Sequence, residues 1–454
     1  MRKTSGRARN RLAALTTASI LAVLGATAPS AGALPPEPPL ATSSNVNVLD
    51  HIPGTAAGMN FKDHYAFVTG WSGVTVLDIA TPEAPQVVGE LPLAHFENED
   101  VDLCGDILIV TNDREARDLG SVMYVVSIAD PTSPTVVGVL PLGLTGEGRG
   151  SGHIANFVKA DCTQAWMDGG DHVEVVDLTD PTAPKSLGKF ESAASMSDNF
   201  KVSHDTERDS TGTLWNVGGG GAAGYRLTDD PLAPKLLGTT GAAGVNPSPY
   251  NDFILHNSQR RGETLLITEE DYVDQDEVPP GGCRGQGKFE TWSLAGLKNG
   301  SITPQDTWET ELNGMFTGGA VDSKAPVTAN CSSHWFDAKQ GIAAVGWYEQ
   351  GVRFLSYQSP TDVKQVGYYI PANGSTWAAY WSPTDPDGEI VYTADAYRGI
   401  DVLRIDGGGR KAKKVKAPVP KSWFGSPTSD SSYAEAHPTF GFACPVLKSG
   451  ATLP

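Results

Sequence analysis

The sequence has few charged residues and no long segment with helical periodicity. Charged residues make up 19% of the 454 residues, while glycine (51) and proline (32) are abundant. The absence of apolar residues at helical spacing excludes a mainly helical fold. Short apolar stretches between turns that contain glycine or proline are typical of β-strands, so we expect an all-β protein.

The signatures of several common enzymes and metal sites are also absent. No Gly-x-Ser-x-Gly or His-Glu-x-x-His motif occurs, which excludes the usual serine-hydrolase and zinc-protease signatures. The five cysteines show no Cys-x-x-Cys spacing, which argues against a structural zinc site and a dithiol redox motif. One cysteine must remain unpaired or pair outside the chain.

The first 33 residues have the three-part layout of a secretory signal peptide. A basic opening, MRKTSGRARNR, precedes the apolar run LAALTTASILAVLGATA and the small residues SAGA. The run is shorter than the about 20 residues of a membrane span, and no later segment is suited to crossing a bilayer. We expect cleavage after Ala33, secretion, and disulfide formation.

The chain is acidic, with a net charge of −19. Removal of the first 33 residues takes away five basic residues and no acidic ones, which leaves the mature chain at −24. Such a surface repels nucleic acid and anionic lipid and suits metal ions or cationic partners. We therefore expect no nucleic-acid partner and a monomer. We also expect no membrane span, because no segment of the mature chain is suited to crossing a bilayer.

A repeat of about 50 residues runs through the chain. An alternating apolar strand, a turn with two prolines and a short second strand recur in copies that begin at Val74, Met123, Val173 and Ala223. Seven units of about four short strands each predict a β-propeller rather than a sandwich. The last apolar residues of the alternating strands mark the units: Ile79, Ile128, Leu178, Leu227, Leu294, Tyr357 and Ile405.

These units resemble the LVIVD-repeat family, whose members carry an alternating apolar strand, an Asp-Pro-x-x-Pro turn and a Val-x-Gly strand. The resemblance covers about residues 45 to 406, with four close copies and three degenerate ones. It implies a seven-bladed β-propeller. It does not imply one function, because propellers host many unrelated activities.

The last unit lacks a fourth strand after IDVLRI, whereas the N-terminal segment NVNVLDHI is an unassigned strand of suitable length. We predict that this N-terminal strand completes the seventh blade and closes the ring. The expected organisation is a signal peptide (1–33), an N-terminal linker (34–44), the propeller (45–406), a basic linker (407–422) and a C-terminal tail (423–454).

Five histidines fall near the start of the innermost strand in successive units: His95, His153, His204, His256 and His334. Because the innermost strands begin at one face of a propeller, these side chains should ring one mouth of the central channel. Imidazoles that converge with carboxylates suit iron, copper, manganese or zinc, so one divalent transition metal ion is the expected cofactor. In the alternative, the histidines only bond neighbouring backbone and no cofactor is present.

The loops and strands around the same mouth should also supply carboxylates and flat aromatic surface for a small molecule, glycan or peptide. The expected ligand-binding residues are Glu269, Asp271, Trp347, Tyr348, Glu349, Tyr380, Trp381, Asp395, Tyr397 and Arg398. Two functions follow from this mouth. One is an exported binding or interaction protein, and the other is a metal-dependent extracellular oxidoreductase or polysaccharide lyase. No catalytic residue is assigned.

The repeat also suggests disulfide partners. Cys104 and Cys162 each lie nine residues after a histidine of the repeat, so adjacent blades should place them side by side. Cys283 and Cys331 lie in longer loops around the fifth unit and are candidates for a second disulfide.

Overall fold

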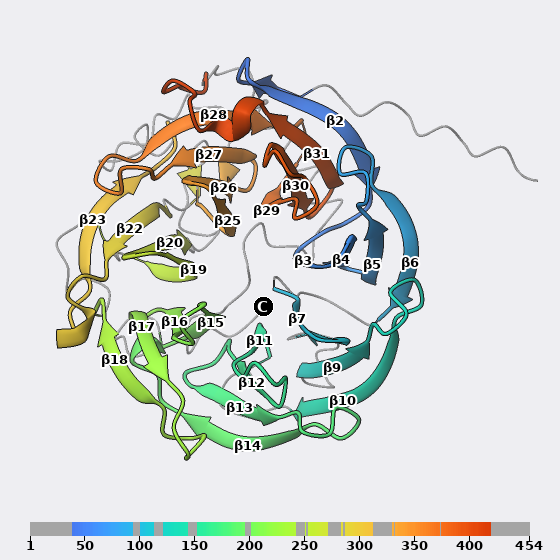
Figure 1. The fold of residues 1–454 in the computed structure, drawn as a ribbon, viewed down its shortest axis with the longest axis vertical. Coiled ribbons are helices and arrows are strands. Elements are labelled where there is room, and N and C mark those ends of the chain that lie inside the picture. The colour runs from blue at the N-terminus through green and yellow to red at the C-terminus, as the bar shows by residue number, and fades with distance from the viewer. Residues whose placement is uncertain are drawn as a thin grey trace, which may run out of the picture. The chain divides into compact units, whose positions relative to one another are not determined.

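The computed structural model describes residues 39–93, 100–112, 121–143, 152–195, 201–241, 250, 253–270, 283–284, 287–311, 329–330, 332–372 and 374–418. These residues form seven antiparallel sheets arranged in a ring (Figure 1). The fold is therefore the predicted seven-bladed β-propeller of four-stranded blades.

The first four blades follow the chain in order. Blade 1 holds β3 (Met59–Lys62), β4 (Tyr65–Gly70), β5 (Gly73–Asp78) and β6 (Gln86–Pro92). Blade 2 holds β7 (Asp102–Cys104), β8 (Ile107–Asn112), β9 (Ser121–Ser127) and β10 (Thr135–Gly143). Blade 3 holds β11 (Ala155–Phe157), β12 (Gln164–Met167), β13 (Val173–Asp177) and β14 (Lys185–Phe190). Blade 4 holds β15 (Ser203–Arg208), β16 (Leu214–Gly218), β17 (Gly221–Arg226) and β18 (Lys235–Thr239).

The remaining blades contain the more divergent units. Blade 5 holds β19 (Ile254–Arg261), β20 (Thr264–Glu270), β22 (Phe289–Ser293) and β23 (Thr303–Trp308). Blade 6 holds β25 (Phe336–Lys339), β26 (Ile342–Gly346), β27 (Val352–Ser356) and β28 (Lys364–Ile370). Blade 7 holds β29 (Thr376–Trp381), β30 (Ile390–Asp395), β31 (Gly399–Ile405) and the N-terminal β2 (Val46–Pro53).

The N-terminal strand closes the ring, as predicted. β2 pairs antiparallel with β31, from Val46 opposite Ile405 to Pro53 opposite Gly399. The short β1 (Ala41–Thr42) adds a fifth strand to blade 6 through β28. Because the first and last parts of the ring share one sheet, the propeller is closed by hydrogen bonds between strands.

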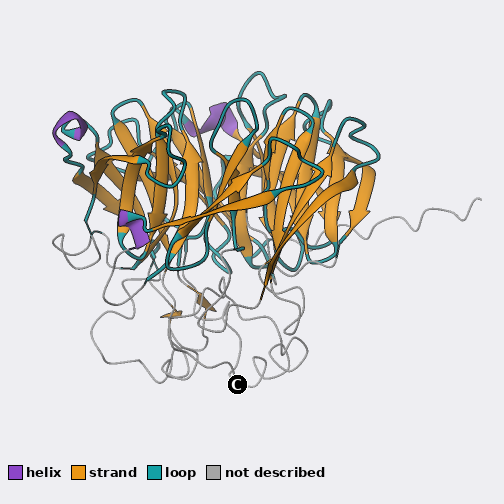
Figure 2. Cartoon of the chain, turned by 90° about the horizontal axis from the view of Figure 1, so that it is seen from below, coloured by secondary structure: helices purple, strands orange, loops and turns teal. Residues whose placement is uncertain are grey.

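Strands and loops make up nearly all of the described chain (Figure 2). The helical segments among the described residues are the short 3-10 helices η1 (Ala193–Ser195), η2 (Leu297–Asn299) and η4 (Asp406–Gly409). In the part of the chain that the structure describes, no helix is long and apolar enough to cross a membrane.

The repeated Asp-Pro turn has a local cause. Asp130 accepts hydrogen bonds from the N–H and the hydroxyl of Thr132, at 3.0 and 2.8 Å. Asp180 does the same with Thr182, at 3.0 and 2.7 Å. Such a side chain folds the backbone over itself, so the outer two strands of a blade reverse direction in a few residues.

The apolar core is divided into clusters that lie between neighbouring blades. One such cluster joins Trp166 and Val175 of blade 3 to Leu214 and Tyr225 of blade 4. Alternating side chains on each strand cover both faces of a blade, so every blade buries apolar surface against two neighbours. The central channel is thereby left to polar side chains of the innermost strands.

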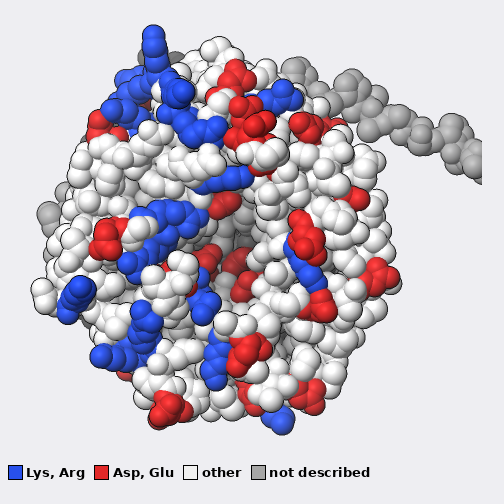
Figure 3. Space-filling view, in the orientation of Figure 1, with Lys and Arg blue, Asp and Glu red and all other residues white. Residues whose placement is uncertain are grey.

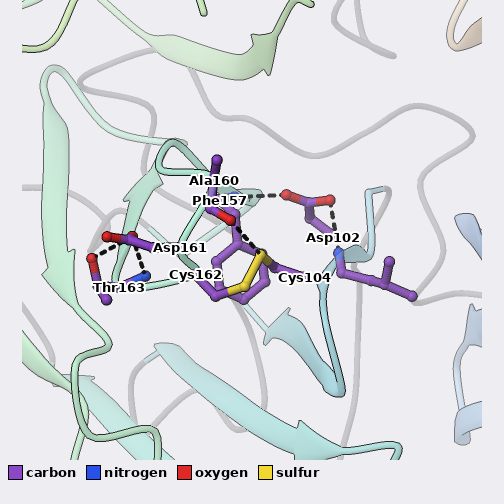
Figure 4. Close-up of a disulfide and its surroundings, with 8 residues drawn as sticks. Asp102, Cys104, Phe157, Ala160, Asp161, Cys162 and Thr163 are labelled. Carbon is purple, nitrogen blue, oxygen red and sulfur yellow. Dashed lines mark hydrogen bonds between the residues drawn. A yellow bond between two sulfur atoms is a disulfide. The ribbon is translucent and has the colours of Figure 1, made fainter.

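A disulfide joins blades 2 and 3, as predicted. Cys104 and Cys162 are bonded with their Cα atoms 5.5 Å apart (Figure 4). Beside it, the carboxylate of Asp102 accepts the backbone N–H of Phe157 at 2.6 Å. For the second predicted disulfide, β21 (Cys283–Arg284) pairs parallel with β24 (Ala329–Asn330). Cys331 itself lies outside the described residues, so this disulfide stays a prediction.

We expect the Cys104→Ser/Cys162→Ser double variant to lower the free energy of unfolding by about 2–4 kcal/mol. The bond spans 58 residues of sequence and restricts the unfolded chain. Urea denaturation of both proteins under oxidising conditions measures the difference. A variant as stable as the natural protein would contradict a structural role for the bond.

Candidate metal centre

Four histidines from adjacent blades stand in a row. His153, His204, His256 and His334 come from blades 3, 4, 5 and 6, and each is no more than 1% exposed. Neighbouring ring centroids are 4.8, 4.0 and 4.0 Å apart in that order. The structure thus brings together four of the five histidines expected at the mouth, while His95 lies outside the described residues.

β-bulges set the direction of these side chains. In β15 the residues on either side of His204 pair with consecutive residues of β16, so His204 is the extra residue of a bulge. His256 has the same place in β19, and Trp377 has it in β29. The extra residue of a bulge leaves the regular alternation of a strand, and such residues are frequent beside functional sites.

The histidine hydrogen bonds fix which ring nitrogen carries the proton. Nδ1 of His204 lies 3.0 Å from the carbonyl oxygen of His256, and Nδ1 of His334 lies 2.8 Å from that of Trp377. A carbonyl only accepts, so in each ring Nδ1 must be the donor. In the neutral ring Nε2 then carries the lone pair, the usual arrangement of a metal-binding histidine. The same bonds tie blade 4 to blade 5 and blade 6 to blade 7.

Two of the histidines and a glutamate offer ligand atoms to one point. His204, His256 and Glu270 each place one such atom within 4.8 Å of the others. Nε2 of His256 is 3.4 Å from Oε2 of Glu270, and all three side chains are fully buried. Ligands at about 2.0–2.2 Å from one zinc ion lie somewhat closer together than this. The group has a suitable composition and would contract slightly around an ion.

Glu270 was not among the residues predicted from the sequence, which included its neighbour Glu269 instead. Glu269 accepts the backbone N–H of Phe253 at 3.4 Å and pairs with Lys288, also at 3.4 Å. Adjacent side chains of a strand point to opposite faces, so only Glu270 turns towards His256. Asp271, the next residue, lies outside the described part of the chain.

Tyr348 completes the cluster. Its hydroxyl donates to Oε1 of Glu270, and its ring centroid is 5.0 Å from that of His334. Its φ of 44° lies in the left-handed region that residues other than glycine rarely adopt. Hydrogen bonds of 2.9 Å in both directions with the backbone of Thr376 hold it there. Strained residues of this kind concentrate at functional sites.

Three predicted aromatic residues lie in the packing between elements rather than in this cluster. Trp347 packs against Trp308, with ring centroids 5.2 Å apart, and Trp381 packs against Phe354 at 6.1 Å. Tyr380 stacks edge-on against a phenylalanine of blade 1. The residue of blade 7 that contacts the histidine row is Trp377, whose ring centroid lies 5.0 Å from that of His334.

The remaining predicted ligand-binding residues lie near the start of β31 and in the loop after Tyr348. Asp395 accepts the N–H groups of Tyr397 and Arg398, both at 3.0 Å, and so closes a turn. Arg398 also pairs with Asp401 at 3.2 Å. Glu349 is half-buried. No ligand contact tests these residues, and their role stays a prediction.

Buried carboxylates lie next to the histidine row. Asp168 accepts hydrogen bonds from Ser203, from the hydroxyl of Thr206 at 2.7 Å and from the amide of Asn216 at 3.0 Å. Burial nevertheless raises the pKa of Asp168 to about 6, against an ordinary value of 3.8, while the hydrogen bonds and His153 oppose the shift.

This shift predicts how stability depends on pH. Between pH of about 4 and 6 the folded protein keeps the Asp168 proton that the unfolded chain releases. The free energy of unfolding should therefore fall as pH rises through this window, by about 3 kcal/mol for this group. In urea denaturation across the window, Asp168→Asn should show a shallower fall.

A matched control is Asp180→Asn. The hydroxyl of Thr182 holds the pKa of the exposed Asp180 below its ordinary value, so this variant should keep the fall seen in the natural protein. An unchanged slope in Asp168→Asn would contradict the assignment.

Comparisons with known proteins support the fold and no further identity. No family model matches the chain, and no curated protein matches it. A solved protein of Lactobacillus plantarum is similar with a TM-score of 0.50 and 11% identity, over 75% of this chain and 87% of that one. The periplasmic gluconolactonase PpgL of Pseudomonas aeruginosa is similar with a TM-score of 0.53 and 12% identity, over 82% of this chain and 95% of that one. At such identities the likeness concerns architecture alone, and the chain is a seven-bladed β-propeller protein.

Proposed function

We propose that this protein is a secreted metalloprotein that holds one divalent transition metal ion with His204, His256 and Glu270. The ion would use its open coordination positions to bind an oxygen-bearing group of a small molecule, glycan or peptide. The observation that carries the proposal is the convergence of these three buried side chains within 4.8 Å. Three protein ligands leave at least one position free on a four-coordinate ion.

The chemistry of the three side chains supports this assignment. Burying a carboxylate and imidazoles away from water is costly unless they are paired or bind a metal. Two imidazoles with one carboxylate suit iron and zinc, and manganese and copper also accept such ligands. An ion held in this way acts as a Lewis acid, which polarises a bound oxygen or lowers the pKa of a bound water.

Secretion and membership of the LVIVD-repeat family are parts of the same proposal. The signal-peptide pattern of residues 1–33 supports export, and the disulfide between Cys104 and Cys162 suits an oxidising compartment. The Asp-Pro-x-x-Pro turns support the family. We expect a monomer without nucleic-acid partners, since the net charge is strongly negative.

A second candidate function is metal-dependent catalysis, as an oxidoreductase or a polysaccharide lyase. It is favoured by Tyr348, whose hydroxyl bonds Glu270 and whose backbone is strained. A tyrosine hydroxyl beside a metal ligand is placed to give or take a proton from a bound substrate. In this function, Tyr348→Phe would keep the metal and lose turnover.

Elemental analysis of the mature protein, purified without a histidine tag, tests the proposal. We expect about one equivalent of metal in the natural protein, as for a single site. A folded His204→Ala/His256→Ala variant should contain none, and His64→Ala, altered between β3 and β4, should keep it. If the natural protein stays empty after incubation with iron, copper, manganese and zinc, the histidines serve only to bond neighbouring backbone.

A further inference from the structure

A cavity of about 270 Å³ opens on the wall of the central channel, away from the histidine row. Its lining comes mainly from the inner strands of blades 1 to 4. It includes the acidic and amide side chains of Asn60, Asp100, Asp102, Asn156 and Glu207, and the basic residues Lys159 and Arg208. Asn156 and Glu207 stand three residues after His153 and His204 in the sequence, a separation of about 10 Å along a strand. Figure 3 shows acidic side chains within the central hollow of the ring.

Two buried side chains have oxygen atoms without a hydrogen-bond partner among the described residues: Asn156, which lines the cavity, and Asp205, which lies in β15 next to the lining residue Thr206. Asn156 is 5% exposed, and its amide nitrogen donates a hydrogen bond to Asp100. The amide oxygen of Asn156, Oδ1, therefore points away from Asp100. This Oδ1 has no partner. Asp205 is fully buried, and apart from the backbone N–H of the adjacent Thr206 its carboxylate oxygens have no partner. Asp205 is close enough to Asp100 and Glu207 to be repelled by both.

Tethering between blades does not account for these oxygens. Other carboxylates of the inner strands do serve as tethers: Asp102 accepts the N–H of Phe157 at 2.6 Å, and Asp337 accepts that of Trp381 at 3.0 Å. Asp205 makes no such bond. A buried polar oxygen that makes no hydrogen bond is unfavourable, so a positive ligand would relieve a real penalty.

We propose that the channel holds a second site, for a hydrated hard divalent cation, Ca²⁺ or Mg²⁺, formed by Asp100, Asn156, Asp205 and Glu207. All four offer oxygen atoms, which these ions prefer over nitrogen. Among the His, Cys, Asp and Glu side chains of the described chain, only the His204, His256 and Glu270 group brings three ligand atoms within 4.8 Å of one another. The channel carboxylates are therefore spaced for an ion that keeps part of its water shell, for which the cavity has room.

The test uses the mature full-length protein after treatment with EDTA, titrated with Ca²⁺ and with Mg²⁺ in a calorimeter. The natural protein should bind one ion, and Asp205→Asn should bind it at least about tenfold more weakly. Thermal unfolding provides a second measurement, because the change in Tm on adding Ca²⁺ can be compared even if the variant is less stable. Without divalent ions Asp205→Asn should be at least as stable as the natural protein, because repulsion is removed, and millimolar Ca²⁺ should reverse this order.

Two controls separate this site from the histidine centre. Asp106→Asn, at a carboxylate 63% exposed beside Lys62, should bind Ca²⁺ as the natural protein does. The His204→Ala/His256→Ala variant should keep Ca²⁺ while losing the transition metal, so the two sites can fail separately. Absence of Ca²⁺ and Mg²⁺ binding by the folded natural protein, or equal binding by Asp205→Asn, would overturn the proposal and leave only water in the cavity.

Discussion

Replacing Glu270 by glutamine is expected to abolish the stabilisation that a divalent transition metal gives this protein. A ligand present at a hundred times its Kd stabilises the folded state by about 2.7 kcal/mol, which is readily seen in thermal unfolding. The variant keeps the size of the side chain but removes the negative charge that sits 3.4 Å from His256. We expect the shift in Tm on adding zinc, iron, manganese or copper to disappear.

Glu269→Gln is the matched control, because it changes the neighbouring residue of the same buried strand. It should lower stability by itself, since the buried Lys288 loses its partner. The shift in Tm with metal should nevertheless remain. Loss of that shift in Glu269→Gln, with retention in Glu270→Gln, would mean that the strand presents the opposite face to the site.

Replacing Gly169 by alanine should lower the free energy of unfolding by about 2–5 kcal/mol. Gly169 has a φ of 111°, which alanine rarely adopts. Its added Cβ would also lie 2.4 Å from the Cβ of His153, a distance that forces the histidine or the backbone to move. Urea denaturation measures the loss.

Gly262→Ala separates the two causes. Gly262 has a φ of 64°, but an added Cβ would meet nothing within 4 Å. Gly262→Ala should therefore lower the free energy of unfolding by only about 1–2 kcal/mol, the cost of a left-handed backbone at alanine. Equal losses in the two variants would contradict close packing of Gly169 on His153.

The architecture was accessible from the sequence because each blade repeats its own local signals. In each close copy, the alternating strand, the proline-containing turn and the following short strand specify two strands and their order. The unassigned strand NVNVLDHI at residues 45–52 predicted how the ring closes, and β2 occupies that place. The Cys104–Cys162 bond followed from the same repeat, since equivalent positions of adjacent blades face each other.

The details of the site were less accessible, because bulges and strand register are invisible in the repeat. Tyr380 was among the ligand-binding residues expected in blade 7, but the extra residue in β29 puts Trp377 beside the histidine row. The run Glu269, Glu270 and Asp271 offered three carboxylates with no signal for which one faces inward. A shift of one residue along a strand moves a side chain to the other face, so pairing with β19 decides this.

Aromatic residues were also harder to place than histidines. Trp347 precedes a loop at the mouth, yet its side chain packs against Trp308 in the cluster between blades 5 and 6. A large apolar ring gains more from burial in such a cluster than from lining a polar channel. Nothing in the local sequence distinguishes the two positions.

The most direct test of the proposed metal centre is a crystal structure of the metal-loaded mature protein with anomalous diffraction at the absorption edge of the ion. We predict one anomalous peak within about 2.3 Å of Nε2 of His204, a ring nitrogen of His256 and a carboxylate oxygen of Glu270. The ligand atoms of the three side chains, which lie within 4.8 Å of one another without an ion, should have moved closer together. No peak at these residues in fully loaded crystals, or a peak held by other residues, would contradict the proposed centre.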